Sequence, residues 1–447
     1  METVLIVTLG TLCMVLPFWL GARFGLVPLV SPMHLLSYFC AFGFVIKVVV
    51  YGFVPEFAFF QRYIDTPGAL LTGVVYLASF ILLMCLGYLC AVRSDQMRPG
   101  IAEARHIAAG IERRGWLFAS AFGVAAVTIV LLLDARGLSL LSRDILAQVN
   151  ADKQIKVNAS GVGATLAGIK TFFIVPKCAF VLLLAQGIVL QERRILAQAA
   201  ILAGLLVLIA LMSGDRFELV ELLVFGLAVY LILGGRIGVR IGVLALAAVV
   251  TLFLLVSYMT VLRGGDRGLW AQMVGSTYFL DINAAVMVTD RVTPAMYLWG
   301  ESYGWWSFGW IPRAIWVDKP AIDLGVFLKR DVMGVTTGGA FNVTGPGEAF
   351  INFGWAGAGV GFILGWLYRK GEVAVLCAHN SLRYGAFLLY PLIFYPFVQA
   401  TLQSSFSAFV VGAAAQLVLI WAMIVIFVPR YRIRRYGPAM KGVPHHV

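Results

Sequence analysis

Residues 69–92 read ALLTGVVYLASFILLMCLGYLCAV, a run with no charged side chain that is long enough to cross a bilayer as one helix. The chain is 61% hydrophobic and 13% charged, with a mean hydropathy of +0.91, which is typical of membrane proteins. Further runs of spanning length cover residues 3–21, 30–53, 116–133, 164–188, 196–212, 219–234, 241–261, 347–368, 385–402 and 406–428. The sequence therefore predicts an all-α polytopic membrane protein, a single transmembrane domain over residues 1–447 with about eleven transmembrane helices.

Basic residues indicate how these spans are oriented, because cytoplasmic connections carry an excess of Lys and Arg. If the C-terminus is inside, every short inside connection carries cations, whereas the opposite orientation places the same cations outside. These cations are Arg23, Arg93, Arg98, Arg105, Arg113, Arg114, Arg193, Arg194, Arg236, Arg240, Arg369, Lys370, Arg383, Arg430, Arg432, Arg434, Arg435 and Lys441. We therefore expect the N-terminus outside and the C-terminus inside. Most of the net charge of +12 then reflects topology, and no nucleic-acid partner is expected.

One long non-membrane segment, residues 262–346, lies outside in this topology. Its parts 278–298 and 302–316 are apolar enough to form interfacial helices or to dip into the bundle. Residues 299–320, which include the second of these parts, read WGESYGWWSFGWIPRAIWVDKP and hold five of the 11 tryptophans.

The concentration of tryptophans has two interpretations. Aromatic belts mark every bilayer interface, so the rings could simply anchor the loop. Aromatic rings also stack on the apolar faces of sugars, while their N–H and O–H groups bind hydroxyls. On the second interpretation, Trp305, Trp306 and Trp310 are candidate substrate-binding residues.

Several cations stand on the outer side, where the topology rule disfavours them. Arg216, Arg263 and Arg267 follow or precede outer helix ends, and Arg313 and Lys319 follow the tryptophans. Arginines at helix ends often only extend toward the interface. Cations that break the topology rule are nevertheless usually functional, and guanidinium groups bind phosphate oxygens in pairs. We expect these residues to bind an anionic phosphate group.

Two lysines inside a predicted span need a polar environment. Lys170 and Lys177 are seven residues apart and so share a helix face. Each requires a water-filled cavity or an acidic partner such as Glu221. Substrate binding and a structural ion pair are both open for them.

The start of the span at 347–368 combines helix-start signals with polar side chains. Thr344 is a reasonable N-cap and Pro346 suits the first turn. In the expected topology, the free N–H groups of this helix point outward and form an anion site. Glu348 and Asn352 lie one turn apart and share a face, although an acid at a helix start can have no further role.

The string Ile311-Pro312-Arg313, Ile315-Trp316 and Asp318-Lys319-Pro320, followed by Gly347-Glu348 and Asn352-Phe353-Gly354, resembles the bacterial O-antigen and capsule repeat-unit polymerases (Wzy-type). The turn Ser213-Gly214-Asp215-Arg216 is also similar to the membrane arginine of that family. The motifs cover only about residues 213–368. The family usually has both termini inside, whereas the spans counted here place the N-terminus outside.

This resemblance implies a GT-C-like membrane glycosyltransferase on the periplasmic side of the bacterial inner membrane. Donor and acceptor would be glycans linked to undecaprenyl diphosphate, whose diphosphate the arginines would hold. A chain-length regulator and a flippase would be further partners. An O-antigen ligase that transfers the glycan to lipid A core, and a non-catalytic flippase or carrier of lipid-linked sugar, are the alternatives.

No cofactor is expected for this reaction. A divalent metal could neutralise the departing diphosphate, but the outer face shows no tight acidic cluster such as Asp-x-Asp to bind one. Fixed arginines can stabilise the charge that develops on the leaving group. The sequence therefore favours a metal-independent reaction.

The implied reaction needs a group that takes the proton of the attacking hydroxyl, which contributes about 10²–10⁴-fold in rate. The outer carboxylates near the aromatic loop are Asp266, Asp281, Asp290, Glu301, Asp318, Asp323, Asp331 and Glu348. Glu301 lies between Trp299 and Tyr303, an apolar setting that would make it the stronger base. A helix N-terminus would make Glu348 a weaker one. We therefore expect Glu301 to be the base and Glu348 to orient the acceptor or hold an arginine.

The topology can be tested with single cysteines introduced into a cysteine-free variant. An impermeant thiol reagent should label position 330 in intact cells and should not label positions 105 and 434. The reason is that the first position lies in the outer segment and the other two lie in basic inner segments. The reverse labelling pattern would overturn both the orientation and the outer location of the site.

Overall fold

The structure is a computed structural model that describes residues 2–93, 100–134, 170–213, 217–239, 280–311, 315–335 and 341–431, with isolated positions between 242 and 254. Within these ranges the chain is helical and contains no strand. The class of polytopic helical membrane protein is thereby confirmed.

Nine helical segments among the described residues are long and apolar enough to cross a membrane. They are Glu2–Phe24, Pro32–Phe53, Ala69–Cys90, Arg114–Leu133, Thr171–Leu190, Arg193–Leu211, Gly345–Arg383, Ala386–Gln403 and Phe406–Phe427. Each overlaps a predicted run. The predicted run 219–234 corresponds to helix α11 (Phe217–Ile232), which has 16 residues, and most of the run 241–261 lies outside the described residues. The count of eleven and the orientation stay predictions.

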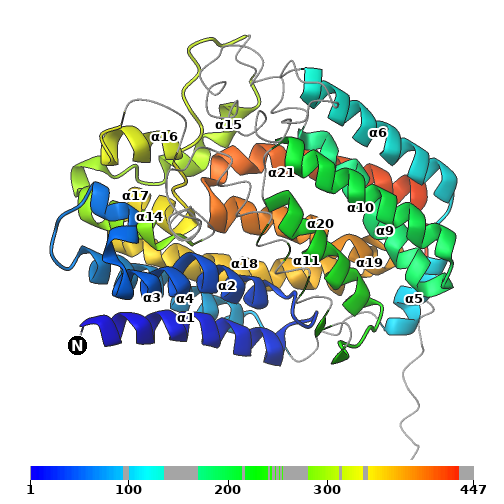
Figure 1. Cartoon of the computed structure of the whole chain (residues 1–447), viewed down its shortest axis with the longest axis horizontal. Coiled ribbons are helices and arrows are strands. Elements are labelled where there is room, and N and C mark those ends of the chain that lie inside the picture. Colours follow the sequence, from blue (N-terminus) through cyan, green and yellow to red (C-terminus); the bar gives the residue numbers. More distant parts are fainter. Residues whose placement is uncertain are drawn as a thin grey trace, which may run out of the picture.

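The main elements follow one another in chain order (Figure 1). They are α1 (Glu2–Phe24), α2 (Pro32–Cys40), α3 (Ile46–Phe53), α4 (Ala69–Cys90), α5 (Ile101–Ala109), α6 (Arg114–Asp134), α9 (Ile174–Leu190), α10 (Arg193–Ser213), α11, α14 (Ile282–Arg291), α15 (Trp306–Gly309), α16 (Gly325–Phe327), α17 (Gly345–Phe353), α18 (Ala358–Leu376), α19 (His379–Arg383), α20 (Tyr390–Val398) and α21 (Phe406–Phe427). A π-helix, η11 (Gln399–Gln403), joins α20 to the turn before α21.

Helices α4 and α18 form the central helix pair, and glycines let their backbones approach closely. A Cβ atom at Gly365 would lie 1.9 Å from the carbonyl oxygen of Met84, and one at Gly361 would lie 2.3 Å from that of Phe80. Small residues at helix interfaces serve this purpose in membranes, where dispersion contacts replace the hydrophobic effect. The paired residue numbers rise together, so α4 and α18 run in the same direction.

A buried ionic cluster ties together the ends of α4 and α18. Arg369 donates to Glu372 at 2.8 Å, and Tyr88 donates to the same carboxylate at 2.8 Å. The other oxygen of Glu372 accepts the backbone N–H of Leu26 at 2.9 Å. Arg369, which the sequence assigns to an inside connection, is thus only 2% exposed and belongs to the packed core. A charge in this position is stable because it is paired and hydrogen-bonded.

The opposite end of the bundle collects the short helices of the long loop (Figure 1). There α14 lies beside α3, to which Lys47 and Tyr51 connect it, and α17 packs on α14. Residues Ile282–Val288 of α14 are all buried, and a Cβ at Gly73 of α4 would clash with Val286. Helix α14 therefore packs inside the bundle, whereas residues 293–298 are exposed or half-buried.

The close packing of α4 on α18 predicts a position-dependent effect of adding one methyl group. Gly365→Ala should lower the free energy of unfolding by about 1–3 kcal/mol, because the backbone of Met84 cannot move away cheaply. Gly359→Ala on the same helix is the control, since nothing lies within 4 Å of its Cβ position. Thermal unfolding in detergent measures both. Equal melting temperatures would contradict this packing.

Candidate functional site

A buried carboxylate, Glu348 on α17, connects three segments at the end of the bundle that carries the loop helices. Its Oε1 atom accepts the hydroxyl of Ser302 at 2.7 Å, and its Oε2 atom accepts the backbone N–H of Phe406 at 2.6 Å. The side chain is 1% exposed. Each oxygen thus has a donor from a segment distant in sequence, which is how a buried carboxylate avoids the penalty of an unpaired charge.

Asn352 extends this connection to the aromatic loop. Its amide donates to the Ser302 hydroxyl at 2.7 Å and accepts the backbone N–H of Gly300 at 2.9 Å. The backbone N–H groups of Leu298 and Trp299 donate to the carbonyls of Ile351 and Asn352. The expected shared face of Glu348 and Asn352 is confirmed, since both contact Ser302. Together they hold the start of the aromatic loop on α17.

The N-terminus of α17 is closed. Thr344 is the N-cap and Pro346 lies in the first turn, as the sequence predicts. However, Gly345 packs so tightly on η11 that a Cβ would lie 1.8 Å from the carbonyl oxygen of Thr401, and residues 343–350 are all buried. The prediction that its N–H groups form an outward-facing anion site is therefore wrong. The sequence could not show that the chain 50 residues later covers this helix start.

Glu301 has a different environment from the one expected. Its side chain is exposed, and its hydrogen bond from Trp305 Nε1 is long, at 3.4 Å. The apolar setting inferred from its neighbours in sequence is therefore wrong. Trp299 is itself 73% exposed, so its ring does not bury the Glu301 carboxylate.

The tryptophans of the loop form an exposed surface. Trp306 and Trp310 are 42% and 48% exposed, while Trp305 packs partly against the core. Lys319 donates to the backbone carbonyls of Gly309 at 2.9 Å and of Ile311 at 2.8 Å. Lys319, predicted to bind diphosphate, is thus bonded to the backbone of the aromatic loop. These two hydrogen bonds hold Lys319 against residues 309 and 311 and so keep this part of the aromatic loop together.

A second buried ionic cluster lies between α9 and α11. Lys177 contacts Glu221 at 2.5 Å and also pairs with Glu218. Glu221 in turn accepts the amide of Gln399 at 2.9 Å. The acidic partner predicted for Lys177 is confirmed, and the ion pair accounts for its charge without a ligand. Since Gln399 begins η11, this cluster connects to the segment that covers α17.

A third buried pair anchors α14. Lys47 of α3 donates to Asp281 at 2.7 Å, and Asp281 also caps α14 by accepting the N–H of Asn283 at 3.0 Å. Tyr51 donates to Asn283 at 3.1 Å. A lysine inside a membrane span needs an acidic partner, so the sequence could have predicted that Lys47 is paired. It could not have predicted which carboxylate is the partner.

Four of the predicted diphosphate-binding residues, Arg216, Arg263, Arg267 and Arg313, lie outside the described residues. Lys170 begins a short 3₁₀ helix, Lys170–Phe173, and its side chain is not described. Their predicted roles stay predictions. Among the residues that the structure does describe, no three His, Cys, Asp or Glu side chains come close enough together to bind a metal ion.

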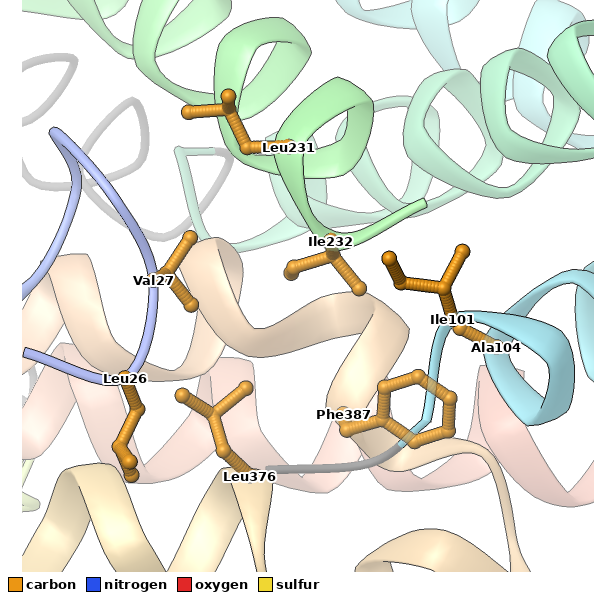
Figure 2. Close-up of a pocket in the computed structure, with 8 residues that line it drawn as sticks. All are labelled: Leu26, Val27, Ile101, Ala104, Leu231, Ile232, Leu376 and Phe387. Atoms are coloured by element: carbon orange, nitrogen blue, oxygen red, sulfur yellow. The ribbon is translucent and has the colours of Figure 1, made fainter. Parts of the chain in front are cut away.

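A small cavity lies at the other end of the bundle and is apolar (Figure 2). The side chains that surround it are Leu26, Val27, Ile101, Ala104, Leu231, Ile232, Leu376 and Phe387. Its volume of about 20 Å³ is close to the space that one water molecule needs. A cavity of this size is too small to bind a sugar or a phosphate.

The chain matches no protein-family model, no curated protein and no solved structure. Fold and site define it as a polytopic helical membrane protein whose loop helices and aromatic segment are fixed to one end of the bundle.

Loss of the Glu348 carboxylate should destabilise the protein. Glu348→Ala leaves the N–H of Phe406 and the hydroxyl of Ser302 without their acceptor, and each loss is worth about 1–3 kcal/mol. The melting temperature in detergent should fall clearly. Glu301→Ala, at an exposed position, is the control and should melt like the wild type. If both variants melt alike, Glu348 does not hold the three segments together.

Proposed function

We propose that this chain is a membrane glycosyltransferase that joins oligosaccharide repeat units linked to undecaprenyl diphosphate into an O-antigen, capsule or exopolysaccharide. The reaction takes place at the periplasmic face of the bacterial inner membrane and uses no metal ion or cofactor. A growing glycan on its lipid is the donor, and one lipid-linked repeat unit is the acceptor.

The observation that carries this proposal is the junction between the start of the aromatic loop and the helix that carries the second motif, Gly347-Glu348 and Asn352-Phe353-Gly354. Ser302, just ahead of the exposed tryptophans, is bonded to both Glu348 and Asn352 of the GE…NFG helix. Segments far apart in the sequence thus meet where membrane helices end. An enzyme for lipid-linked glycans needs this arrangement, since the lipid stays in the bilayer while its sugars lie beyond the helix ends.

The direction of the helices supports the predicted topology. In the eleven-span topology, α4 and α18 are the third and ninth spans and must run in the same direction, as they do. The loop helices then lie at the outer end, and the Arg369 cluster lies at the inner one.

Each group then has a defined task. Exposed Trp306 and Trp310 stack on sugar rings, and Lys319 keeps the aromatic loop in place. Arg216, Arg263, Arg267 and Arg313 bind the diphosphate and stabilise the charge on it as the glycosidic bond forms. Glu348 and Asn352 position the acceptor side of the site through Ser302.

The decisive experiment uses the purified protein and lipid-linked repeat units extracted from a source strain that lacks this chain. A ladder of products that differ by one repeat unit is the expected result. Single transfer to lipid A core would instead show the ligase. No new glycosidic bond, together with movement of the lipid-linked sugar across vesicles, would show a carrier.

The arginines provide an internal test of the same assay. Arg216→Ala and Arg263→Ala should abolish the ladder while the protein stays in the membrane, because each loses a charge-assisted bond worth about 1.5–3 kcal/mol. Lysine at either position should restore activity only in part, since its single ammonium cannot bind two oxygens side by side. Arg330→Ala, which removes an exposed arginine paired with Asp331, is the matched control. Full activity in both alanine variants would refute the diphosphate role.

A further inference from the structure

The aromatic loop packs directly onto the residue that precedes Asp323. Gly309, at the end of α15, lies so close to Ile322 and Val411 that a Cβ there would be 3.3 Å from the first side chain and 2.8 Å from the second. Phe308 and Trp316 meet edge to face, with ring centroids 5.8 Å apart. The backbone of this loop therefore packs against Ile322, the neighbour of Asp323.

Asp323 is held in a fixed position without being enclosed. Its Oδ1 atom accepts the backbone N–H of Gly325 at 2.9 Å. Nearby, the hydroxyl of Ser405 donates to the carbonyl of Ile322 at 3.4 Å, and Ser405 Oγ accepts the N–H of Leu324 at 3.3 Å. Asp323 is half-buried.

Three described carboxylates near the loop differ in the two properties that a proton acceptor needs, access and fixed geometry. Glu348 is fixed but buried, with a donor on each oxygen. Glu301 is accessible, but its hydrogen bond from Trp305 Nε1 is long. Asp323 has both properties, since it is partly exposed and its carboxylate is anchored by the N–H of Gly325.

We propose that Asp323 is the catalytic residue that accepts the proton of the attacking sugar hydroxyl, an inference that rests on the proposed glycosyltransferase function. The acceptor oxygen forms a bond to the anomeric carbon of the donor, and the bond from that carbon to the diphosphate oxygen breaks. The electron pair of the broken bond leaves with the diphosphate, and the hydroxyl proton moves to the Asp323 carboxylate. Charge and atoms balance without a further reactant.

The electrostatic environment supports this role. Burial raises the pKa of Asp323 above its ordinary value, although the N–H of Gly325 and the nearby Ser405 hydroxyl act in the opposite direction. Glu348, on the packed helix α17, is close enough to Asp323 for the two carboxyl groups to affect each other. A carboxylate with a raised pKa is a stronger base.

The test is the ladder assay with full-length Asp323→Asn, which keeps the size of the side chain and removes its basicity. Its kcat should fall by about 10²–10⁴-fold while KM stays nearly unchanged, because the acceptor still binds. Asp323→Glu should regain part of the activity. Asp331→Asn, in the same outer segment and paired with Arg330, is the control and should keep wild-type kcat.

Two further measurements separate catalysis from folding. Asp323→Asn should melt like the wild type, and the extracted lipid-linked repeat unit should raise its melting temperature as much as it does for the wild type. Wild-type kcat in Asp323→Asn would overturn the proposal, as would loss of the stabilisation by repeat unit. If Glu301→Gln loses kcat and Asp323→Asn does not, the base is Glu301. If the wild type forms no glycosidic bond, the proposed function itself fails, and this inference fails with it.

Discussion

A carboxylate inside a protein is unfavourable unless donors replace the water it loses, and Glu348 is where this constraint shapes the end of the bundle that carries the loop helices. Its two oxygens take one donor from the aromatic loop and one from the start of α21. Three segments that are far apart in the sequence must therefore stay together. The position at which the aromatic loop begins depends on that junction.

Buried charges among the described residues have hydrogen-bond or ion-pair partners at both ends of the bundle, so a buried charge by itself does not mark a site. At one end, Arg369, Glu372 and Tyr88 form a cluster, and the nearby cavity is small and lined by apolar side chains. At the end that carries the loop helices, the Lys177 cluster reaches η11 through Gln399, and η11 covers the N-terminus of α17. This end differs because it also carries exposed aromatic rings and the half-buried Asp323.

Uninterrupted apolar runs predicted most of the fold, since a helix in lipid must satisfy its backbone internally and its length is fixed by the bilayer. The same local logic predicted the partner of Lys177 and the shared face of Glu348 and Asn352. This reasoning from neighbouring residues failed at side chains whose surroundings are formed by a segment distant in the sequence. Neighbours in sequence suggested an apolar setting for Glu301, yet Trp299 lies exposed beside it. The open N-terminus expected for α17 is covered by Thr401, and only tertiary packing could reveal that. Nothing local distinguished Asp323 from the other outer carboxylates, because Ser405, which bonds its neighbours Ile322 and Leu324, follows some 80 residues later.

The central claim is that Glu348 and Ser302 form one interaction that fixes the aromatic loop to the membrane helices. A double-mutant cycle with Ser302→Ala and Glu348→Gln, measured as free energy of unfolding in detergent, tests it most directly. Residues that share a buried hydrogen bond couple by about 0.5–3 kcal/mol, so the double variant should be less destabilised than the sum of the two single variants. Additive effects would contradict the account.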